Sequence, residues 1–285
     1  TYVQLHAEVP FVHIRAYMLQ AYHLFTQMYA NISYMVSDLT SYPRPNVAVD
    51  LVLLTVGNLD ADDERRPRLS VVVQRRADGR AVLPGRFVRE RRTMIETAAE
   101  VLAEKLDIRP RRRLTMTMID VYDDPSRDDR GWVVSVAYTA VLLQPEVSRL
   151  ARDRVELMPL HGDAARGRRI TPESLAYDHD HMVTTAVRRA RRRYERSPDP
   201  LDLLRPPYTL SQLRHVHEAV LDTGLKRDTF NRRMLPFLEP ALDSRGEEML
   251  RTEAVGRPAQ LYRRTSRTER DPEAGPFPLP RSNVR

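Results

Sequence analysis

Apolar residues along the first half of the chain form two kinds of pattern, and each kind predicts a different element. Residues at helical spacing form one apolar stripe over Thr93–Lys105. Continuous apolar runs rich in β-branched residues are typical of buried strands, and they occur at Val47–Val56, Leu69–Arg76, Leu114–Asp124 and Gly131–Leu143. Strands that surround one central helix predict an α/β (α+β) domain with mixed strand pairing.

The pattern changes in the last third of the chain to short helices followed by strands. Thr209 is a suitable N-cap for a helix that Asp222-Thr223-Gly224 ends, since Gly is common just past a helix end. A second, basic helix runs from Lys226 to about Leu235, where Pro236 ends it. The segments LEPALD and AQLYRR then bracket a polar stretch, as two strands bracket a wing. This order predicts a winged helix-turn-helix.

Composition narrows the function classes. The 285 residues carry a net charge of +7, which comes from arginine and favours a polyanionic partner such as nucleic acid or a phosphorylated ligand. A codon bias toward arginine is the alternative source of that excess. The chain has no Cys, which excludes disulfides, thiol catalysis and cysteine-based zinc sites and fits a cytoplasmic protein.

The N-terminal stretch has two interpretations. It is rich in aromatic residues and poor in charge, and we expect no membrane span because polar residues interrupt its apolar run. Either Phe11–Tyr29 is a helix that packs on a partner surface, or Met35 is the true start of the protein.

The stretch Leu83–Ile108, LPGRFVRERRTMIETAAEVLAEKLDI, resembles the signature of the Nudix diphosphate hydrolases in its frame. In that family an Arg-Glu pair and a Glu-Glu pair place carboxylates on one helix face, where they hold Mg²⁺. Here the loop Glu falls on Arg92, the Arg-Glu pair on Glu100 and Val101, the Glu-Glu pair on Glu104 and Lys105, and the last Gly on Asp107. We therefore predict no catalytic residue, no metal and no cofactor; an ordinary amphipathic helix after a glycine turn is the alternative.

Further motifs resemble the Nudix-related transcriptional regulators called NrtR. In the first half these are Asp-Asp-Pro before Arg130-Gly131-Trp132, the SVAY strand, and Leu175-Ala176-Tyr177-Asp178-His179. In the last third, TLSQL, LKRDTFNRRML and GRPAQLYR are similar to the family's TLxEL, its F-x-R-x-M-L recognition helix and its GRPAxLYR wing strand. The resemblance implies a Nudix-like α/β/α sandwich followed by a winged helix-turn-helix. It also implies a regulator, with repression the expected mode, that binds a double-stranded DNA operator and senses ADP-ribose or a related nucleotide or sugar phosphate, in NAD or sugar metabolism.

On this basis we divide the chain into five segments. They are an N-terminal extension at 1–42, a Nudix-like ligand-sensing domain at 43–196, a Pro-rich linker at 197–208, the winged domain at 209–267, and a tail at 268–285 with the composition of a disordered segment. We expect a homodimer, because readers of this type need two half-sites, and no membrane partner.

The predicted DNA-binding residues are Lys226, Arg227, Thr229, Arg232, Arg233 and Arg257. Arg232 is the candidate for a base edge or a nearby phosphate, and the other cations position the protein on phosphates, with Arg257 at the wing tip. Thr229 replaces the Asn usual in the family, and Phe230 is assigned to the core. From Arg205 to Arg267 there are 12 Lys and Arg against 8 Asp and Glu, a balance that favours phosphate binding.

The predicted ligand-binding residues are Arg86, Arg89, Arg92 and Glu104, with the arginines holding a diphosphate in place of the metal. Solvated loop arginines are the alternative. The run Asp178-His179-Asp180-His181 has metal-ligand residue types, but Asp178 as a helix N-cap is the favoured interpretation. The arginines between Arg188 and Arg193 are either a solvated helix face or contacts to DNA phosphates or a partner subunit.

The leading hypothesis is a dimeric DNA-binding repressor whose Nudix-like domain senses a nucleotide-sugar diphosphate. The alternative is a Nudix-type diphosphate hydrolase with an atypical metal site. A purely structural binding module is the third class, and it predicts no sequence-selective DNA binding.

Overall fold

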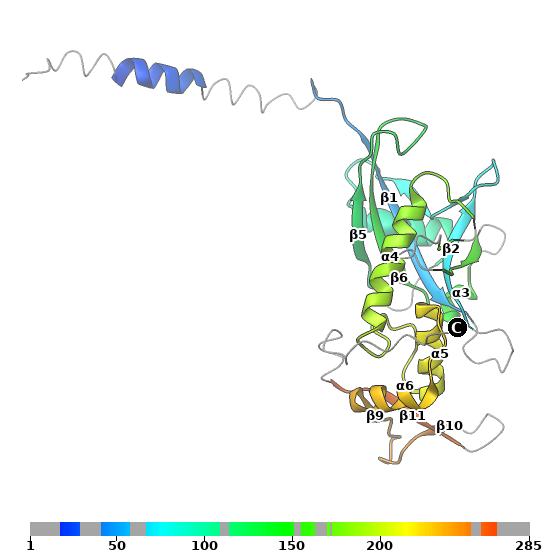
Figure 1. Ribbon diagram of the computed structural model, residues 1–285. Helices are drawn as coiled ribbons and strands as arrows, with labels where there is room; N and C mark the ends of the chain where they lie inside the picture. The colour runs from blue at the N-terminus through cyan, green and yellow to red at the C-terminus, as the bar shows by residue number, and fades with distance from the viewer. Residues whose placement is uncertain are drawn as a thin grey trace, which may run out of the picture. The chain divides into compact units, whose positions relative to one another are not determined.

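This computed structural model describes residues 18–28, 41–57, 67–108, 114–150, 155–162, 170–171, 173–251 and 258–266. Contacts divide the chain into two units, Thr1–Pro45 and Asn46–Arg285. In the first unit, residues 18–28 form a helix with exposed side chains (Figure 1). The helix predicted at Phe11–Tyr29 is confirmed over these residues alone, and Met35 lies outside the described ones. Of the helices in the described ranges, none is long and apolar enough to cross a bilayer.

A mixed seven-stranded sheet forms the centre of the second unit, and β1 (Asn46–Val56) lies at its middle. β1 runs parallel to β6 (Val133–Val141) and antiparallel to β2 (Leu69–Arg75). β5 (Thr117–Tyr122) forms the edge beyond β6. The remaining strands are β3 (Ala81–Val82) and β7 (Glu156–Pro159), both on β2, and β4 (Gly85–Phe87) on β1. The four predicted strands are confirmed, with β5 starting three residues later than the apolar run.

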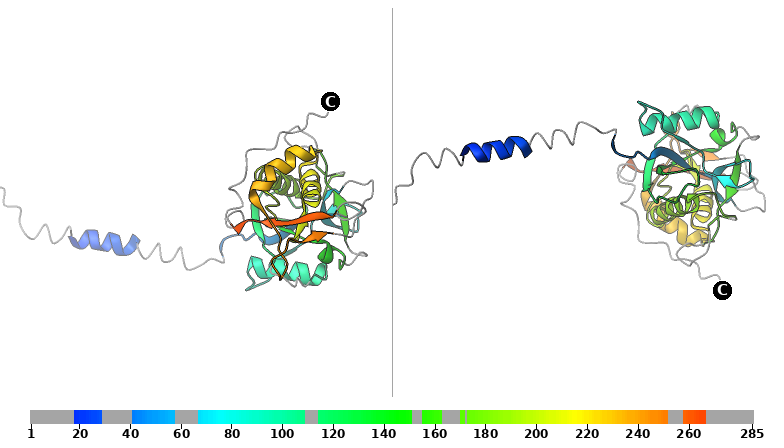
Figure 2. Two further views of the ribbon diagram at one scale, coloured as in Figure 1. Left: turned by 90° about the horizontal axis from the view of Figure 1, so that it is seen from below. Right: turned by 90° about the horizontal axis from the view of Figure 1, so that it is seen from above.

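Helices cover the two faces of this sheet (Figure 2). Alternate side chains of β1 point to opposite faces. Val49, Leu51 and Leu53 pack with α2 (Met94–Glu100) and the π-helical segment η2 (Val101–Lys105). Val52, Leu54 and Val56 pack on the other face with α4 (His179–Tyr194). The predicted α/β/α sandwich is confirmed, and burial on both faces explains why β1 is apolar at almost every position. A short helix, α3 (Gln144–Val147), follows β6.

The helix predicted at Thr93–Lys105 is α-helical only up to Glu100. Its N-terminus is fixed by a capping box, in which Thr93 Oγ1 accepts from the Glu96 backbone N–H and the Glu96 carboxylate accepts from the Thr93 N–H. From Val101 the backbone widens into η2. This change sets the direction of the last side chains of the segment.

The last third of the second unit contains α5 (Leu210–Leu221), α6 (Arg227–Met234) and a 3₁₀ turn, η4 (Leu235–Phe237). Thr209 caps α5 in a capping box with Gln212, as predicted for the cap. α5 ends at the predicted Asp222-Thr223-Gly224 stop, and its C-cap is Asp222, in the left-handed region (φ 50°). Asp tolerates this conformation, and the Asp222 carboxylate accepts a hydrogen bond from the Gly162 N–H at 2.8 Å.

A small antiparallel sheet follows α6 and confirms the predicted wing strands. β9 (Leu238–Pro240) and β11 (Ala259–Arg264) pair directly. Two strands that the sequence did not indicate, β8 (Tyr208–Thr209) and β10 (Leu250–Arg251), also pair with β11. β8 lies immediately before α5, so the sheet holds the start of the helical pair.

The end of α4 is buried against α5 and α6. The ring of Tyr194 contacts the ring of His217 with centroids 4.9 Å apart, and His217 contacts Phe230 at 5.1 Å. The buried Asp199 carboxylate accepts hydrogen bonds from the N–H groups of Leu203 and Leu204 and from the Tyr194 hydroxyl. The Pro-rich linker is therefore packed into the same core as the helices that it joins.

Two arginines near the end of α4 hold this joint together. Arg191 donates to the carbonyls of Val220 (2.9 Å) and Gly162 (2.7 Å), and Arg193 donates to the Pro200 carbonyl (3.0 Å). For these two residues, neither a solvated helix face nor a DNA contact is correct, because their guanidinium groups bond to backbone carbonyls. Arg188, Arg189 and Arg192 are exposed. Arg189 makes one long hydrogen bond, 3.4 Å, to the Met118 carbonyl at the surface, and the two alternatives stay open for these three residues.

The buried groups at this joint titrate in opposite senses. Burial raises the pKa of Asp199 to about 6 and lowers the pKa of His217 to about 3. Between about pH 4 and 6, Asp199 is protonated in the folded state and ionised in the unfolded state. The contribution of Asp199 to the free energy of unfolding therefore rises as the pH falls from 6 toward 4. His217 stays neutral while the unfolded state binds a proton below about pH 6.5, so this group destabilises the fold over the same interval.

We expect Asp199→Asn to remove the pH-dependent contribution of Asp199 to stability and to leave that of His217. The free energy of unfolding of the variant should fall more steeply than that of the wild type between about pH 6 and 4, by up to about 1.4 kcal/mol per pH unit. Urea denaturation at several pH values measures both slopes. Asp123→Asn, at an exposed carboxylate, should leave the slope unchanged, and equal slopes for Asp199→Asn and wild type would contradict the assignment.

Candidate functional site

We call the stretch Leu83–Ile108 the box, its residues 85–92 the box loop, and α2 with η2 the box helix. The box loop begins at a position where only glycine fits. β4 pairs with β1 so that Gly85 lies opposite Asp50, and a Cβ on Gly85 would overlap the Asp50 Oδ1 atom and crowd the Val49 carbonyl. Asp50 is buried and accepts a hydrogen bond from Ser135 Oγ at 2.6 Å. The loop and a buried carboxylate are therefore fixed against each other. The sequence did not single out Asp50, because it stands inside an apolar strand.

Asp50 is the centre of a group of buried charges. Its Oδ2 atom lies 3.8 Å from Arg127 Nη2 and 3.6 Å from His179 Nε2. Desolvation on its own would raise the pKa of Asp50, but the neighbouring His179, Ser135 and Arg127 outweigh it, so the pKa lies below its ordinary value. The Leu83 N–H donates to His179 Nδ1, which leaves Nε2 as the protonated nitrogen facing Asp50.

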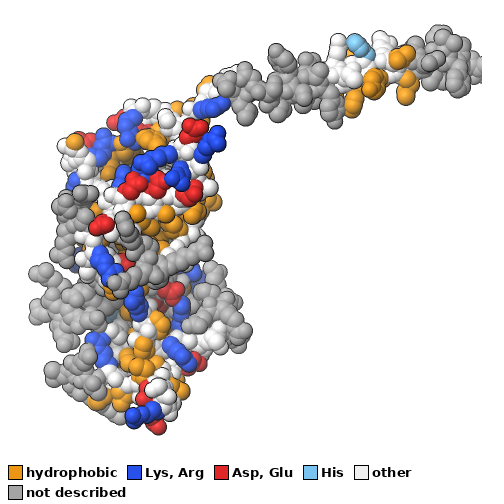
Figure 3. Space-filling model, turned by 180° about the vertical axis from the view of Figure 1, so that it is seen from behind, with side chains coloured by type: hydrophobic (Ala, Val, Ile, Leu, Met, Phe, Trp, Pro, Cys, Tyr) orange, Lys and Arg blue, Asp and Glu red, His pale blue; other side chains and the backbone are white. Residues whose placement is uncertain are grey.

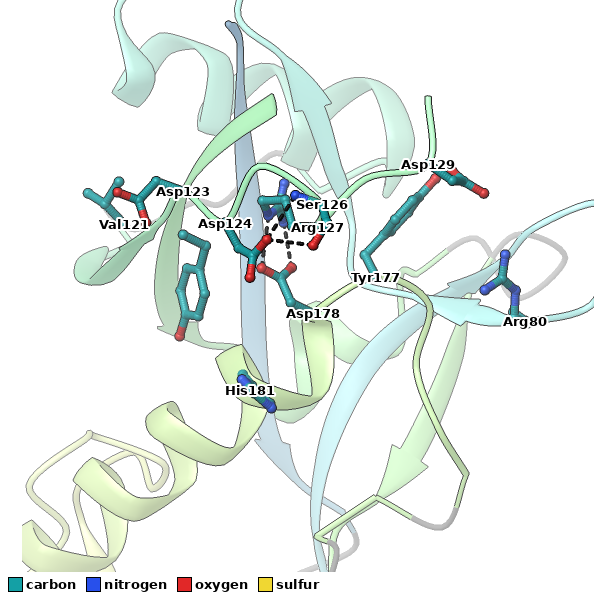
Figure 4. Close-up of a pocket in the computed structure, with 11 residues that line it drawn as sticks. Arg80, Val121, Asp123, Asp124, Ser126, Arg127, Asp129, Tyr177, Asp178 and His181 are labelled. Atoms are coloured by element: carbon teal, nitrogen blue, oxygen red, sulfur yellow. Dashed lines mark hydrogen bonds and ion pairs between the residues drawn. The ribbon is translucent and has the colours of Figure 1, made fainter. Parts of the chain in front are cut away.

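Arg127 and Asp178 form a bidentate pair, with Nε–Oδ2 and Nη2–Oδ1 distances of 2.8 and 2.6 Å, and the Arg127 side chain is only 3% exposed (Figure 4). Asp178 immediately precedes α4, as predicted for an N-cap, but its side chain makes no capping hydrogen bond. Its carboxylate is committed to Arg127 instead. Asp180 accepts from Thr171 Oγ1 and the Leu175 N–H, so it too is occupied by structural bonds.

A cavity of about 320 Å³ opens between the box loop and this charged group. Its size is within the range of small-molecule sites. Cations outnumber carboxylates on its walls, and the charged residues that line it are Arg76, Arg86, Lys105, Arg127 and Arg130 against Asp50 and Asp128. The Arg130 guanidinium lies over the rings of Phe87 (5.2 Å) and Tyr177 (5.1 Å), and Arg76 lies over Tyr177 (4.9 Å). We name this cavity the box pocket; its lining suits an anionic ligand with planar or apolar parts.

A second cavity, of about 520 Å³, lies beside the box pocket. Arg127 and Tyr177 line both, so these two side chains form the wall between them. The second cavity is acidic, with Asp123, Asp124, Asp129 and Asp178 in its lining and Arg80 at one end (Figure 4). The two neighbouring cavities thus differ in charge.

The four predicted ligand residues gather on one surface, but three of them do not line the box pocket. Arg86 alone does. The loop arginines form ion pairs with two carboxylates of the box helix. Arg86 lies 3.0 Å from Glu100 and 2.9 Å from Glu104. Arg89 lies 3.6 Å from Glu100 and 3.8 Å from Glu104, and Arg92 lies 3.3 Å from Glu100. Figure 3 shows such intermingled positive and negative side chains on one face. The alternative of freely solvated loop arginines is wrong for Arg86, which is largely buried.

The residues at the box do not fit a magnesium ion. Mg²⁺ needs oxygen ligands in octahedral geometry, yet the carboxylates of Glu100 and Glu104 are bound by arginines. Lys105, which replaces the second glutamate of the Glu-Glu pair, donates its ammonium to the Gly85 carbonyl. The part of the chain that the structure describes contains no cluster of three His, Asp or Glu side chains able to hold a metal, including the run from Asp178 to His181.

The predicted DNA-binding residues lie mainly on α6. Phe230 and Met234 are buried and hold the helix on α5, which confirms the core assignment of Phe230. Lys226, Arg227 and Arg232 are exposed, and Thr229 and Arg233 are half-buried. Arg257 lies outside the described residues. The exposed face of α6 is therefore basic.

The chain is similar to known proteins over both parts. A family profile described as the NrtR DNA-binding winged helix domain matches residues 200–264. The ADPR responsive transcriptional repressor NtrR of Acinetobacter baylyi is 26% identical over 229 residues, which cover 79% of this chain and 84% of the relative.

The chain is also similar to solved structures. The crystal structure of Shewanella oneidensis NrtR is 28% identical with a TM-score of 0.57, covering 82% of this chain and 98% of that one, and the same protein crystallised with a 27mer DNA matches equally well. A MutT/nudix family protein from Enterococcus faecalis, at 22% identity, has a TM-score of 0.61 over 84% of this chain and 93% of that chain, which shows the fold alone.

Fold and profile together define a Nudix-like domain followed by a winged helix-turn-helix domain. The chain is similar to NrtR proteins over both of these domains. The predicted fold class and family resemblance are confirmed.

We expect Arg127→Met to destabilise the protein by about 3–5 kcal/mol, because it leaves the buried carboxylate of Asp50 and the partly buried carboxylate of Asp178 without their cation. Urea denaturation measures the loss. Arg75→Met is the matched control: its partners Glu156 and Glu173 are each 2.7 Å away, but all three side chains are exposed, so the cost should stay below about 1 kcal/mol. Equal costs for the two variants would show that the buried pair is not a structural centre.

Proposed function

We propose that this protein is a DNA-binding transcriptional regulator, acting as a repressor, whose Nudix-like domain senses an ADP-ribose-like effector. The observation that carries this proposal is the joint presence of a basic, exposed α6 in an NrtR-type winged domain and a cationic pocket at a box without metal ligands. Residues 43–196 form the sensor, 197–208 the linker and 209–267 the DNA-binding domain. The repressor of A. baylyi, named for its response to ADPR, supports the same assignment.

For the DNA-binding domain, α6 enters the major groove and Arg232 reaches a base edge or the nearest phosphate. Lys226, Arg227 and Arg233 contact phosphates, which fix the position of the protein without reading sequence. Thr229 lies on the same helix, and Arg257 extends the contact through the wing. S. oneidensis NrtR with a 27mer DNA supports this use of the domain. A homodimer supplies two such helices for two half-sites.

For the sensor, the diphosphate of the effector lies in the box pocket. Arg86 is the predicted ligand residue that lines it, and Arg76 and Arg130 add guanidinium groups suited to phosphate oxygens. Arg89, Arg92 and Glu104 act through Arg86, because the carboxylates of Glu100 and Glu104 hold its guanidinium. A ligand that is longer than a diphosphate can extend past Tyr177 into the acidic cavity, where carboxylates accept hydrogen bonds from sugar hydroxyls.

The route from effector to DNA is α4. His179 at its first turn lines the box pocket, and Tyr194 at its last turn packs on His217, which packs on Phe230 of α6. At about 1.5 Å per residue, this helix links sites separated by its full length. An effector that prefers one position of α4 by a few kcal/mol shifts the spacing of the two recognition helices in a dimer.

The enzyme alternative is a diphosphate hydrolase with an atypical metal site. The misfit of magnesium at Glu100, Glu104 and Lys105 argues against it. Incubation of the pure protein with ADP-ribose and Mg²⁺ separates the two functions. We expect calorimetry to show saturable binding of ADP-ribose, with no release of AMP or ribose phosphate. Repeated turnover, with more product than protein, would establish the hydrolase instead.

We expect Arg232→Ala to weaken specific DNA binding by about 1–3 kcal/mol at fixed salt. The probe is the duplex that wild-type protein selects from random sequences, and fluorescence anisotropy measures the affinity. Arg149→Ala, at an exposed position of the sensor domain, is the control for loss of one positive charge. Unchanged affinity for Arg232→Ala would remove it from the interface, and failure of the wild type to select any sequence would contradict the regulator itself.

A further inference from the structure

Lys105 lines the box pocket but has no role in the function proposed for it. It stands where the Nudix signature has a metal-binding glutamate. Its ammonium donates to the Gly85 carbonyl on β4, its side chain is half-buried, and it shares the lining of the pocket with Asp50, Arg86 and Arg130. A positive charge is thus held at the point on the box helix where a divalent cation would need a negative ligand.

Two elements fix this ammonium in place. The π-helical segment η2 supplies the side chain, and its buried residues Val101 and Leu102 anchor that segment to the sheet. β4 supplies the carbonyl, and its pairing with β1 holds Gly85 opposite Asp50. The charge therefore has a defined position, unlike that of an exposed lysine.

The surroundings of the Lys105 ammonium disfavour its positive charge. Burial, and after it the neighbouring Arg86, lower the pKa of Lys105, and Asp50 only partly opposes this. An anion placed between Lys105 and Arg86 attracts both cations and so offsets the repulsion between them. The pocket is consequently arranged to gain from binding a phosphate group.

We propose that the Lys105 ammonium takes the place of the divalent cation, so that the box pocket binds a diphosphate without metal. This inference rests on the proposed function, because it requires the box pocket to be the effector site. An ammonium is a point charge that neutralises phosphate oxygens, but it does not lower the pKa of a bound water as a metal ion does. The pocket therefore binds the ligand but does not cleave it, for two reasons. Lys105 replaces a metal-binding glutamate, and the carboxylates of Glu100 and Glu104 are paired with an arginine.

The test is calorimetric titration of the full chain with ADP-ribose, once in EDTA and once in excess MgCl₂. Wild type should bind with the same affinity in both buffers. Lys105→Gln should weaken binding about tenfold or more in both, the loss expected for one charge-assisted hydrogen bond. Lys105→Glu should bind worse than Lys105→Gln in EDTA and recover in MgCl₂, because adjacent carboxylates at 104 and 105 recreate oxygen ligands for the ion. A purely structural lysine would not confer this metal dependence.

Two further variants keep the result interpretable. Lys105→Arg preserves the charge and should preserve metal-independent binding, and Arg149→Gln removes an exposed charge outside the pocket and should bind as wild type. Thermal melts establish which variants are folded, and if Lys105→Gln is not, the comparison of Lys105→Arg with Lys105→Glu decides. Wild-type binding that needs Mg²⁺, or Lys105→Gln binding as tightly as wild type, would overturn the inference while leaving the effector site in place. Absence of ADP-ribose binding by the wild type in both buffers would contradict the proposed effector as well.

Discussion

The packing of α4 is the constraint on which the rest of the structure depends. One face of this helix covers the central sheet through residues such as Met182 and Ala186, and its end packs against α5 and α6 through Tyr194. A single continuous cluster of buried side chains therefore runs from β1 to Phe230. Because protein interiors are close-packed, a shift of α4 at one end cannot be absorbed within the helix and must be accommodated at the other.

The charged group beneath the box loop depends on the same helix. Asp178 and His179, at its start, meet Arg127 and Asp50 from the sheet side. Buried charges are tolerated only when each has a partner, so the start of α4 cannot leave this position without exposing an unpaired ion to the interior. Arg127 and Tyr177 also separate the two cavities, so Arg127 belongs both to the cavity wall and to the structural ion pair.

The box shows how a site can change its chemistry while its backbone is kept. The glycine turn, the capped helix and the apolar stripe are all present. The carboxylates that remain, Glu100 and Glu104, are neutralised by arginines of the loop, and the lysine at 105 adds a cation. A side-chain cation thus stands where a Nudix hydrolase has a carboxylate for its metal ion, and an ammonium does not lower the pKa of a water molecule as a bound metal ion does.

The sequence by itself determined the elements and their order. Burial on both faces made β1 continuously apolar, helical periodicity identified α2 and α5, and Thr93 and Thr209 began their helices as capping residues should. These features depend on neighbours within one turn or one strand, so local pattern is sufficient to find them. The short strands β8 and β10 were missed because two residues carry no period, and the α-helical end of α2 was misplaced because a π-helical segment begins at Val101.

Only the tertiary structure decided the site. The box motif pointed to Arg86, but Asp50, Lys105, Arg127 and His179 reach the same pocket from segments far apart in the chain. The parallel pairing of β1 with β6 and the position of α4 over the sheet bring them together. Likewise Asp178 was read as a helix cap, since sequence spacing shows that option and not the buried guanidinium that competes for its carboxylate. Ion pairs between residues far apart in the chain leave no periodic pattern in the sequence, so only the packing of the strands and helices shows them.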